Sequence, residues 1–198
     1  VGLLEKQIMN KKDVVKNFEE NYRVLKETCN GHADKILEIG NVIIEAYMNG
    51  NKVLTAGNGG SAADAQHIAT ELVNKLYRHS KALSAVALTC DSAVVTAWSN
   101  DEGYDNVFER QVEAHGKEGD IFIGISTSGN SANVIKAINK ANELGLITVG
   151  LLGKGGGKAK GLCKYEIIVP SDDVARTQEA HLIIYHNICE IVEEAFLK

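Results

Sequence analysis

Short apolar runs alternate with helix-patterned stretches from residue 52 to the end of the chain. The runs are typical of buried strands, because they are mainly aliphatic and lack polar alternation. Strands that alternate with helices imply right-handed crossovers and a parallel sheet covered on both faces. We therefore predict an α/β fold with a five-stranded parallel sheet sandwiched by helices, its strands being Val53–Ala56, Leu83–Leu88, Ile121–Ile125, Ile147–Leu151 and Glu166–Val169.

The first 50 residues carry apolar positions at helical spacing in two stretches, separated by Asn30-Gly31. We predict two amphipathic helices that form an arm, residues 1–50, ahead of one domain, residues 51–198. Their apolar faces either pack on the sheet of the same subunit or hold subunits together, and the pattern leaves both open. The two faces consist of Leu4, Ile8, Val15, Phe18, Tyr22 and Leu25, and of Ile36, Ile39, Ile43 and Tyr47.

Two turns rich in glycine or hydroxyl groups follow predicted strands. The segment Ser126–Ser131 offers four hydroxyls directly before a helix pattern that begins at Ala132. Helix N-termini attract anions through free N–H groups and the helix dipole, and an ordinary N-cap needs only one hydroxyl. The sequence therefore predicts a phosphate site here. The segment Gly57–Ser61 follows the first strand, and both turns fall at the carboxyl ends of strands, where open sheets bind ligands.

The glycine turn allows close approach of its backbone to a ligand. Ser61 with Asp64 predicts a capped helix start directly after it. The turn also matches a dinucleotide fingerprint, but no acidic residue ends the second strand about twenty residues on, so we expect no nucleotide cofactor. Gly153–Gly157 fits no phosphate motif, and we interpret it as a mobile loop.

Four polar residues on two predicted helices are candidates for chemistry. His67 and Glu71 stand four residues apart beside the glycine turn, so one helix face carries both. Such a pair can share a metal ion or place a base beside a substrate; the alternative is a solvated surface contact. Gln178 and His186 share a diagonal row of the C-terminal helix and could reach into a cleft, or could be ordinary helix polar residues.

Composition excludes several classes of function. With 198 residues and a net charge of −5, the chain lacks the basic surface that nucleic acids or anionic membranes require. No apolar stretch approaches the ~18 residues of a membrane span, and no signal peptide is evident, so we expect a soluble cytosolic protein. The cysteines show no metal or disulfide spacing and are expected to be buried, reduced thiols: Cys29, Cys90, Cys163 and Cys189.

Taken together, these segments resemble one family, the phosphoheptose isomerases of the sugar-isomerase (SIS) domain group. The resemblance covers the whole chain and implies a flavodoxin- or Rossmann-like SIS fold in a cytosolic homotetramer. It also implies conversion of sedoheptulose 7-phosphate to D-glycero-D-manno-heptose 7-phosphate, an early step towards nucleotide-activated heptose. The matching stretches are Ala56–Ser61 with Asp64, His67 and Glu71; Ser99–Asp101; Ser126–Ser131; and Arg176–Glu179 with His186.

The resemblance also implies a role for individual residues. Glu71 and His186 would form the acid/base pair. Zinc, reported in this family, would be bound by His67, Glu71, Gln178 and His186. The phosphate would be held by Ser126, Thr127, Ser128 and Ser131, and the sugar by Asn58, Gly59, Gly60, Glu71, Asn100, Asp101 and Gln178.

Gln178 and His186 lie about 12 Å apart along a helix, which is a long reach for one ion. Three explanations remain open: both side chains extend towards a midpoint, Gln178 lies in a loosened first turn, or the two come from different subunits. The last would place the active site at a subunit interface.

Two other functions remain open. One is a non-catalytic SIS protein that binds a sugar phosphate or a replication initiator. The other is an aldose–ketose isomerase for hexose phosphates. Retention of Glu71 and His186 beside a full serine turn favours the heptose enzyme.

Overall fold

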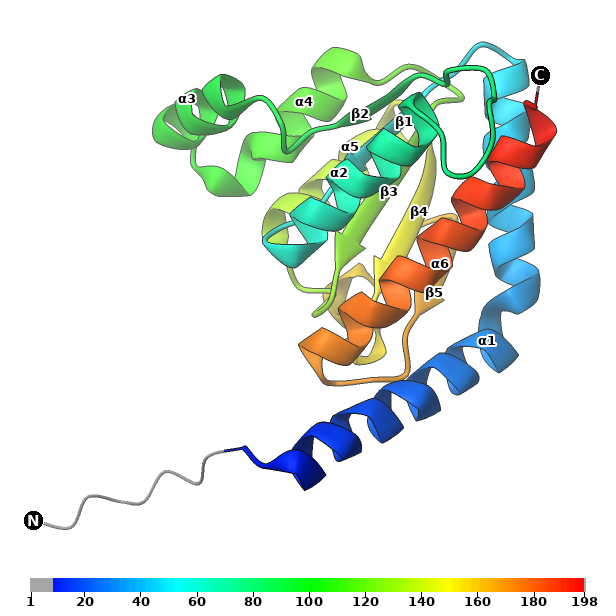
Figure 1. The fold of residues 1–198 in the computed structure, drawn as a ribbon. Coiled ribbons are helices and arrows are strands. Elements are labelled where there is room, and N and C mark those ends of the chain that lie inside the picture. Colours follow the sequence, from blue (N-terminus) through cyan, green and yellow to red (C-terminus); the bar gives the residue numbers. More distant parts are fainter. Residues whose placement is uncertain (1–8, 198) are drawn as a thin grey trace, which may run out of the picture.

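Five parallel strands form one sheet in the order β2-β1-β3-β4-β5, so the predicted α/β architecture is confirmed (Figure 1). The structure is a computed structural model that describes residues 9–197. The apolar runs became strands at nearly the predicted positions, because each supplies side chains to both covered faces of the sheet. The strands are β1 Val53–Ala56, β2 Ala85–Ala87, β3 Ile121–Ser126, β4 Ile147–Leu152 and β5 Tyr165–Ile168.

Two hydrophobic cores lie on opposite faces of this sheet. Successive strand residues point to opposite faces, so Ile121 joins one core and Phe122 the other. The first core packs against α1, α2 and α6, and the second against α4 and α5, with α3 at its edge. The helices are α1 Lys11–Met48, α2 Gly60–Val73, α3 Ser92–Glu102, α4 Val107–His115, α5 Ala132–Glu143 and α6 Val174–Ala195, with short 3₁₀ segments η1 Tyr104–Asn106 and η2 Lys154–Ala159.

The N-terminal arm is one helix, α1, so the prediction of two helices separated at Asn30-Gly31 is wrong. Figure 1 shows a continuous helix that changes direction partway along its length. An interior glycine costs a helix only about 1 kcal/mol, and burial of Ile39 and Ile43 in the first core offsets that cost. The predicted apolar positions Leu4 and Ile8 lie outside the described residues.

The two halves of α1 use their apolar faces differently. Ile39, Ile43 and Tyr47 are buried against the sheet and α6 of the same chain. Phe18 and Tyr22, in the first half, are 70% and 79% exposed. Packing on the subunit's own core is therefore confirmed for the second half, and subunit assembly through the first half stays a prediction.

Two local predictions are corrected by the structure, and a third stays a prediction. The N-cap of α2 is Gly59, without a side-chain cap bond, while Ser61 is buried inside the first turn, so the predicted cap box is wrong. The prediction that all four cysteines are buried is also wrong. Cys29 and Cys90 are exposed, Cys163 is partly buried and Cys189 is buried, because the burial of each thiol depends on which face of its helix or loop carries it. Gly153–Gly157, interpreted as a mobile loop, covers the N-cap and the first four residues of the kinked segment η2, in which Gly155, Gly156 and Gly157 have non-helical backbone angles; its mobility stays a prediction.

None of the described helices combines the length and the apolar character that a membrane crossing requires.

Candidate active site

The glycine turn and the serine turn lie next to each other at the carboxyl edge of the sheet. β1 and β3 are hydrogen-bonded neighbours, with Ala56 opposite Gly124. Just beyond them, the side-chain amides of Asn58 and Asn133 exchange two hydrogen bonds of 2.9 Å each. Asn133 lies at the start of α5 and is 3% exposed. This pair fixes the glycine turn against the N-terminus of α5.

Tyr104 adds a third contact to this junction. Its hydroxyl donates to Oδ1 of Asn58 at 2.8 Å, while the ring stays half exposed. Neither Tyr104 nor Asn133 was predicted from the sequence. Their partner lies 46 or 75 residues away along the chain, so no local pattern signals the contact.

The serine turn gathers hydroxyl groups at the N-terminus of α5. Oγ of Ser126 and Oγ of Ser131 lie 3.1 Å apart, and Ser131 occupies the N-cap without making a side-chain cap bond. Ser128 Oγ accepts from the backbone of Asn130, and Thr127 is half-buried beside it. Hydroxyls and a helix N-terminus can together bind a phosphate group. The predicted anion-binding residues therefore lie together.

The η2 segment packs against the serine turn at Gly129 and Asn130. The amide of Ala159 donates to Gly129 O at 2.9 Å, and the amide of Lys158 donates to Asn130 Oδ1 at 3.1 Å. Gly129 has φ +63°, and a Cβ placed on it would lie 1.9 Å from the carbonyl oxygen of Gly156. The two backbones touch, so glycine is required at this point.

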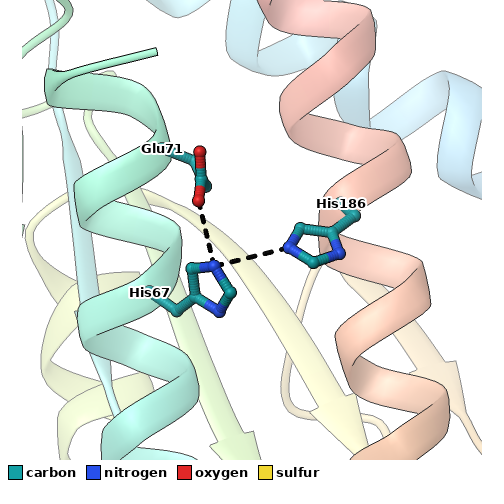
Figure 2. Close-up of side chains that lie close together, drawn as sticks. All are labelled: His67, Glu71 and His186. Carbon is teal, nitrogen blue, oxygen red and sulfur yellow. Dashed lines mark hydrogen bonds and ion pairs between the residues drawn. The ribbon is translucent and has the colours of Figure 1, made fainter. Parts of the chain in front are cut away.

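His67 and Glu71 from α2 meet His186 from α6 in one cluster (Figure 2). His67 Nε2 lies 2.9 Å from Glu71 Oε1 and 3.4 Å from His186 Nε2. One ligand atom from each of the three residues lies within 4.8 Å of the other two. Two imidazoles and a carboxylate suit zinc, which binds nitrogen and oxygen ligands at about 2 Å. The three predicted metal and acid/base residues are thus brought together within a single chain.

Electrostatics favour the neutral imidazole of His186. Burial lowers the pKa of His186, and the neighbouring His67 lowers it further, while Glu71 opposes the shift. A neutral ring keeps a lone pair that can accept a proton or bind a metal ion.

Tyr185 and Asp64, which were not predicted as site residues, form a hydrogen-bonded chain to Nδ1 of His67, the ring nitrogen that faces away from Glu71. The hydroxyl of Tyr185 lies 2.9 Å from His67 Nδ1 and donates to Asp64 Oδ1 at 3.4 Å. Burial raises the pKa of Tyr185, so its phenol stays protonated at neutral pH. Burial also raises the pKa of Asp64, to about 6. The apolar spacing of α6 identifies Tyr185 only as a core residue.

Among the described residues, no hydrogen bond joins the side chain of Gln178 to His67, Glu71 or His186. Gln178 belongs to a regular helix that begins at Val174 and is capped by Asp173, so a loosened first turn does not explain its position. Its amide rests on the glycine turn, since a Cβ on Gly60 would meet Gln178 Nε2 at 2.1 Å. Gln178 thus lies beside the predicted sugar-binding turn, and its role as a metal ligand stays a prediction.

Asn100 and Asp101 lie near the C-terminal end of α3. Both are exposed, and Asn100 Nδ2 donates to Asp101 Oδ1 at 3.0 Å. Within the described part of the chain, no hydrogen bond joins either side chain to the other predicted site residues. Their assignment to the sugar stays a prediction.

Comparison with known proteins identifies the family of this chain. The SIS domain family model matches residues 17–153. A phosphoheptose isomerase from Clostridium acetobutylicum is 52% identical over 178 residues, covering 90% of each chain. One from Aneurinibacillus thermoaerophilus is 54% identical over 163 residues, covering 82% of each chain.

Among solved structures, phosphoheptose isomerase from Neisseria gonorrhoeae superposes with a TM-score of 0.88 at 39% identity, covering 93% of this chain and 98% of that one. Fold and sequence agree: the chain belongs to the phosphoheptose isomerase family of SIS-domain proteins.

Proposed function

We propose that the chain isomerises D-sedoheptulose 7-phosphate to D-glycero-D-manno-heptose 7-phosphate in the cytosol, supplying the synthesis of nucleotide-activated heptose for lipopolysaccharide or capsule. The observation that carries the proposal is the meeting of Glu71, His67 and His186 between α2 and α6. The same helix α2 begins at the glycine turn, next to the serine turn. Membership of the family supports the same activity.

Substrate binding is assigned to the two turns. The hydroxyls of the serine turn and the N-terminus of α5 hold the phosphate. The glycine turn lets the sugar approach the backbone closely, and Asn58, held by its bonds to Asn133 and Tyr104, presents a fixed amide. The sugar contacts are assigned to Asn58, Gly59, Gly60, Glu71, Asn100, Asp101 and Gln178.

Isomerisation moves a carbonyl from C2 to C1 of the open-chain sugar. One proton leaves C1 and one is added to C2 through an enediol, while O2 gains a proton and O1 loses one. Glu71 and His186 are assigned these transfers, because a carboxylate and a neutral imidazole can each take up and return a proton near neutral pH. The reaction is redox-neutral overall and needs no nucleotide cofactor.

A zinc ion fits the donor set of the cluster and would be held by His67, Glu71 and His186. Because Gln178 rests on the glycine turn of its own chain, we assign the fourth ligand to Gln178 of the partner subunit. When bound, zinc supplies Lewis acidity that polarises the sugar carbonyl and stabilises negative charge on the enediolate.

The purified protein is expected to convert sedoheptulose 7-phosphate and to leave fructose 6-phosphate largely unchanged, because the extra carbon separates the phosphate from the reacting end. A chelator is expected to lower the rate and added zinc to restore it. Product formation and solvent deuterium incorporation at the reacting carbons are the measurements. Binding of the heptose phosphate without turnover or deuterium exchange would instead establish a non-catalytic sugar-phosphate receptor, and equal rates on both sugars would establish a broader aldose–ketose isomerase.

We further infer a homotetramer with active sites at subunit interfaces. The exposed apolar residues at the start of α1, with Phe18 and Tyr22 among them, provide a surface for a second copy. The double substitution Phe18→Glu with Tyr22→Glu is expected to give smaller species by light scattering and a matching loss of specific activity. Lys16→Glu, an exposed residue of the same half of α1, serves as the control and should leave both unchanged. Full activity in a monomeric variant would rule out shared active sites.

A further inference from the structure

The side-chain amide of Asn58 is bonded on two sides. Its Oδ1 accepts from Nδ2 of Asn133 at 2.9 Å and from the hydroxyl of Tyr104 at 2.8 Å. Its Nδ2 donates to Asn133 Oδ1 at 2.9 Å. An amide oxygen has two lone pairs, and an amide nitrogen has two hydrogens. Within the described part of the chain, both acceptor positions of Asn58 are therefore occupied, and one N–H remains.

The backbone decides which way round the two amides face. The N–H of Val134 can only donate, and it donates to Asn133 Oδ1 at 2.9 Å. Oδ1 of Asn133 therefore faces Nδ2 of Asn58, and Nδ2 of Asn133 faces Oδ1 of Asn58. Turning the amide of Asn58 by 180° would set oxygen against oxygen and nitrogen against nitrogen. The hydroxyl of Tyr104 thus faces an oxygen, to which it can only donate.

Tyr104 reaches Asn58 from a separate segment, η1, which is itself fixed. Nζ of Lys136 on α5 donates to Asn106 Oδ1 at 2.6 Å, and the ring of Tyr104 meets the buried ring of Phe108 edge-on. A half-exposed tyrosine can bond its hydroxyl to water, so stability alone does not require the bond to Asn58. The effect of that bond is to occupy the last acceptor position of the amide.

The remaining N–H of Asn58 limits which ligand atom can bind beside it. Asn58 is half-buried in the glycine turn, next to the exposed Gly59 and Gly60. A donor pairs with an acceptor, so a carbonyl or hydroxyl oxygen that offers a lone pair fits this position. The hydroxyls of the serine turn can donate or accept and impose no such choice. The selective contact is therefore the amide of Asn58.

We propose that Tyr104 is a positioning residue that, together with Asn133, makes Asn58 a pure hydrogen-bond donor to an acceptor oxygen of the sugar. The inference rests on the proposed function, because it describes how one residue of that substrate site recognises its ligand. Tyr104 itself needs no contact with the sugar. It acts by occupying and orienting Oδ1 of Asn58.

The free N–H is tested directly by ¹⁵N NMR of the side-chain amide of Asn58 in the full chain, with Asn58→Ser providing the assignment. Sedoheptulose 7-phosphate is expected to shift one of the two Nδ2 protons and to leave the other, bonded to Asn133, in place. Inorganic phosphate alone is expected to shift neither, because the phosphate is assigned to the serine turn. Equal shifts with inorganic phosphate, or no shift at saturating sugar phosphate, would overturn the proposal.

Kinetics of Tyr104→Phe give a second readout. The substitution is expected to raise KM for sedoheptulose 7-phosphate about 3–10-fold, the effect of one lost hydrogen bond. Loss of a contact that holds substrate and transition state equally leaves kcat within about twofold. A purely structural role for Tyr104 would lower thermal stability without this split, and a wild-type KM would overturn the positioning role.

Tyr165→Phe is the matched control. Tyr165 begins β5, the outermost strand, at the edge of the sheet opposite the two turns. Its hydroxyl makes no hydrogen bond to any described residue, so the substitution should leave both KM and the Asn58 amide signals unchanged.

The two proposals fail in different ways. Sugar phosphate that shifts the free proton of Asn58 without any turnover would reject the proposed reaction and leave the role of Asn58 intact. An active isomerase whose Asn58 protons stay unmoved would reject the donor role alone. If Tyr104→Phe does not fold, as thermal unfolding would reveal, the wild-type amide signals still decide.

Discussion

Glu71→Gln is expected to lower kcat for sedoheptulose 7-phosphate by at least about a hundredfold, the low end of general acid/base contributions. The amide keeps the size of the side chain and one oxygen that can still face His67, but it cannot accept a proton from carbon. Binding of the sugar phosphate should survive, because the phosphate is assigned to the serine turn, which follows β3 and does not include Glu71. Steady-state kinetics at saturating zinc, with calorimetric titration of the substrate, separate the two effects.

A neighbouring carboxylate provides the control for this substitution. Glu190 lies on α6 one turn beyond His186 and is exposed, so Glu190→Gln removes the same charge without touching the cluster. Its kcat should equal that of the wild type. Undiminished isomerisation in Glu71→Gln would remove Glu71 from the proton transfer, whereas restored rates at higher zinc would reduce its role to metal binding.

Gly129→Ala is expected to destabilise the chain by more than about 3 kcal/mol, among the larger effects of a single substitution. The new Cβ would lie 1.9 Å from the carbonyl oxygen of Gly156, which is backbone and cannot rotate away. Either η2 separates from the serine turn or the turn itself opens. Both outcomes also remove the hydroxyl cluster, so affinity for inorganic phosphate should be lost together with stability in denaturant unfolding.

Gly155→Ala is the control that separates the steric collision of a Cβ from the strain of a positive φ angle. Gly155 has φ +68°, close to the +63° of Gly129, but a Cβ there meets nothing within 4 Å. Its cost should be only the roughly 1–2 kcal/mol of a left-handed alanine. Equal destabilisation by the two substitutions would show that η2 does not press on the turn.

The sheet was predictable because short, uninterrupted apolar runs are typical of strands that are buried on both faces. Ile121–Ile125 can be satisfied only by burial on both faces, and the glycine turn and serine turn mark the ends of two strands. The continuity of α1 was not predictable in this way. Asn30-Gly31 is a valid stop signal locally, and only the packing of Ile39 and Ile43 on a sheet encoded later in the chain overrides it.

In the candidate site, too, local spacing was predictable and long-range contacts were not. His67 and Glu71 could be paired from their spacing, because a helix places residues i and i+4 on one face. The contacts that support them depend on partners more than a hundred residues away, as between Tyr185 and Asp64. A tyrosine at a core position of α6 fits burial alone, and no sequence pattern shows where its hydroxyl points.

The cluster joins residues 119 positions apart, His67 on the first crossover helix and His186 on the last helix of the chain. During synthesis on the ribosome, all five strands are made before α6, so the nascent sheet can pair while the third ligand is still missing. Under the proposed zinc role, a growing chain therefore presents two adjacent ligands, His67 and Glu71, and is expected to capture metal weakly. Under the proposed zinc role, tight metal uptake is then a late event that follows docking of α6, and a chain truncated before residue 174 would contain all five strand segments but lack His186.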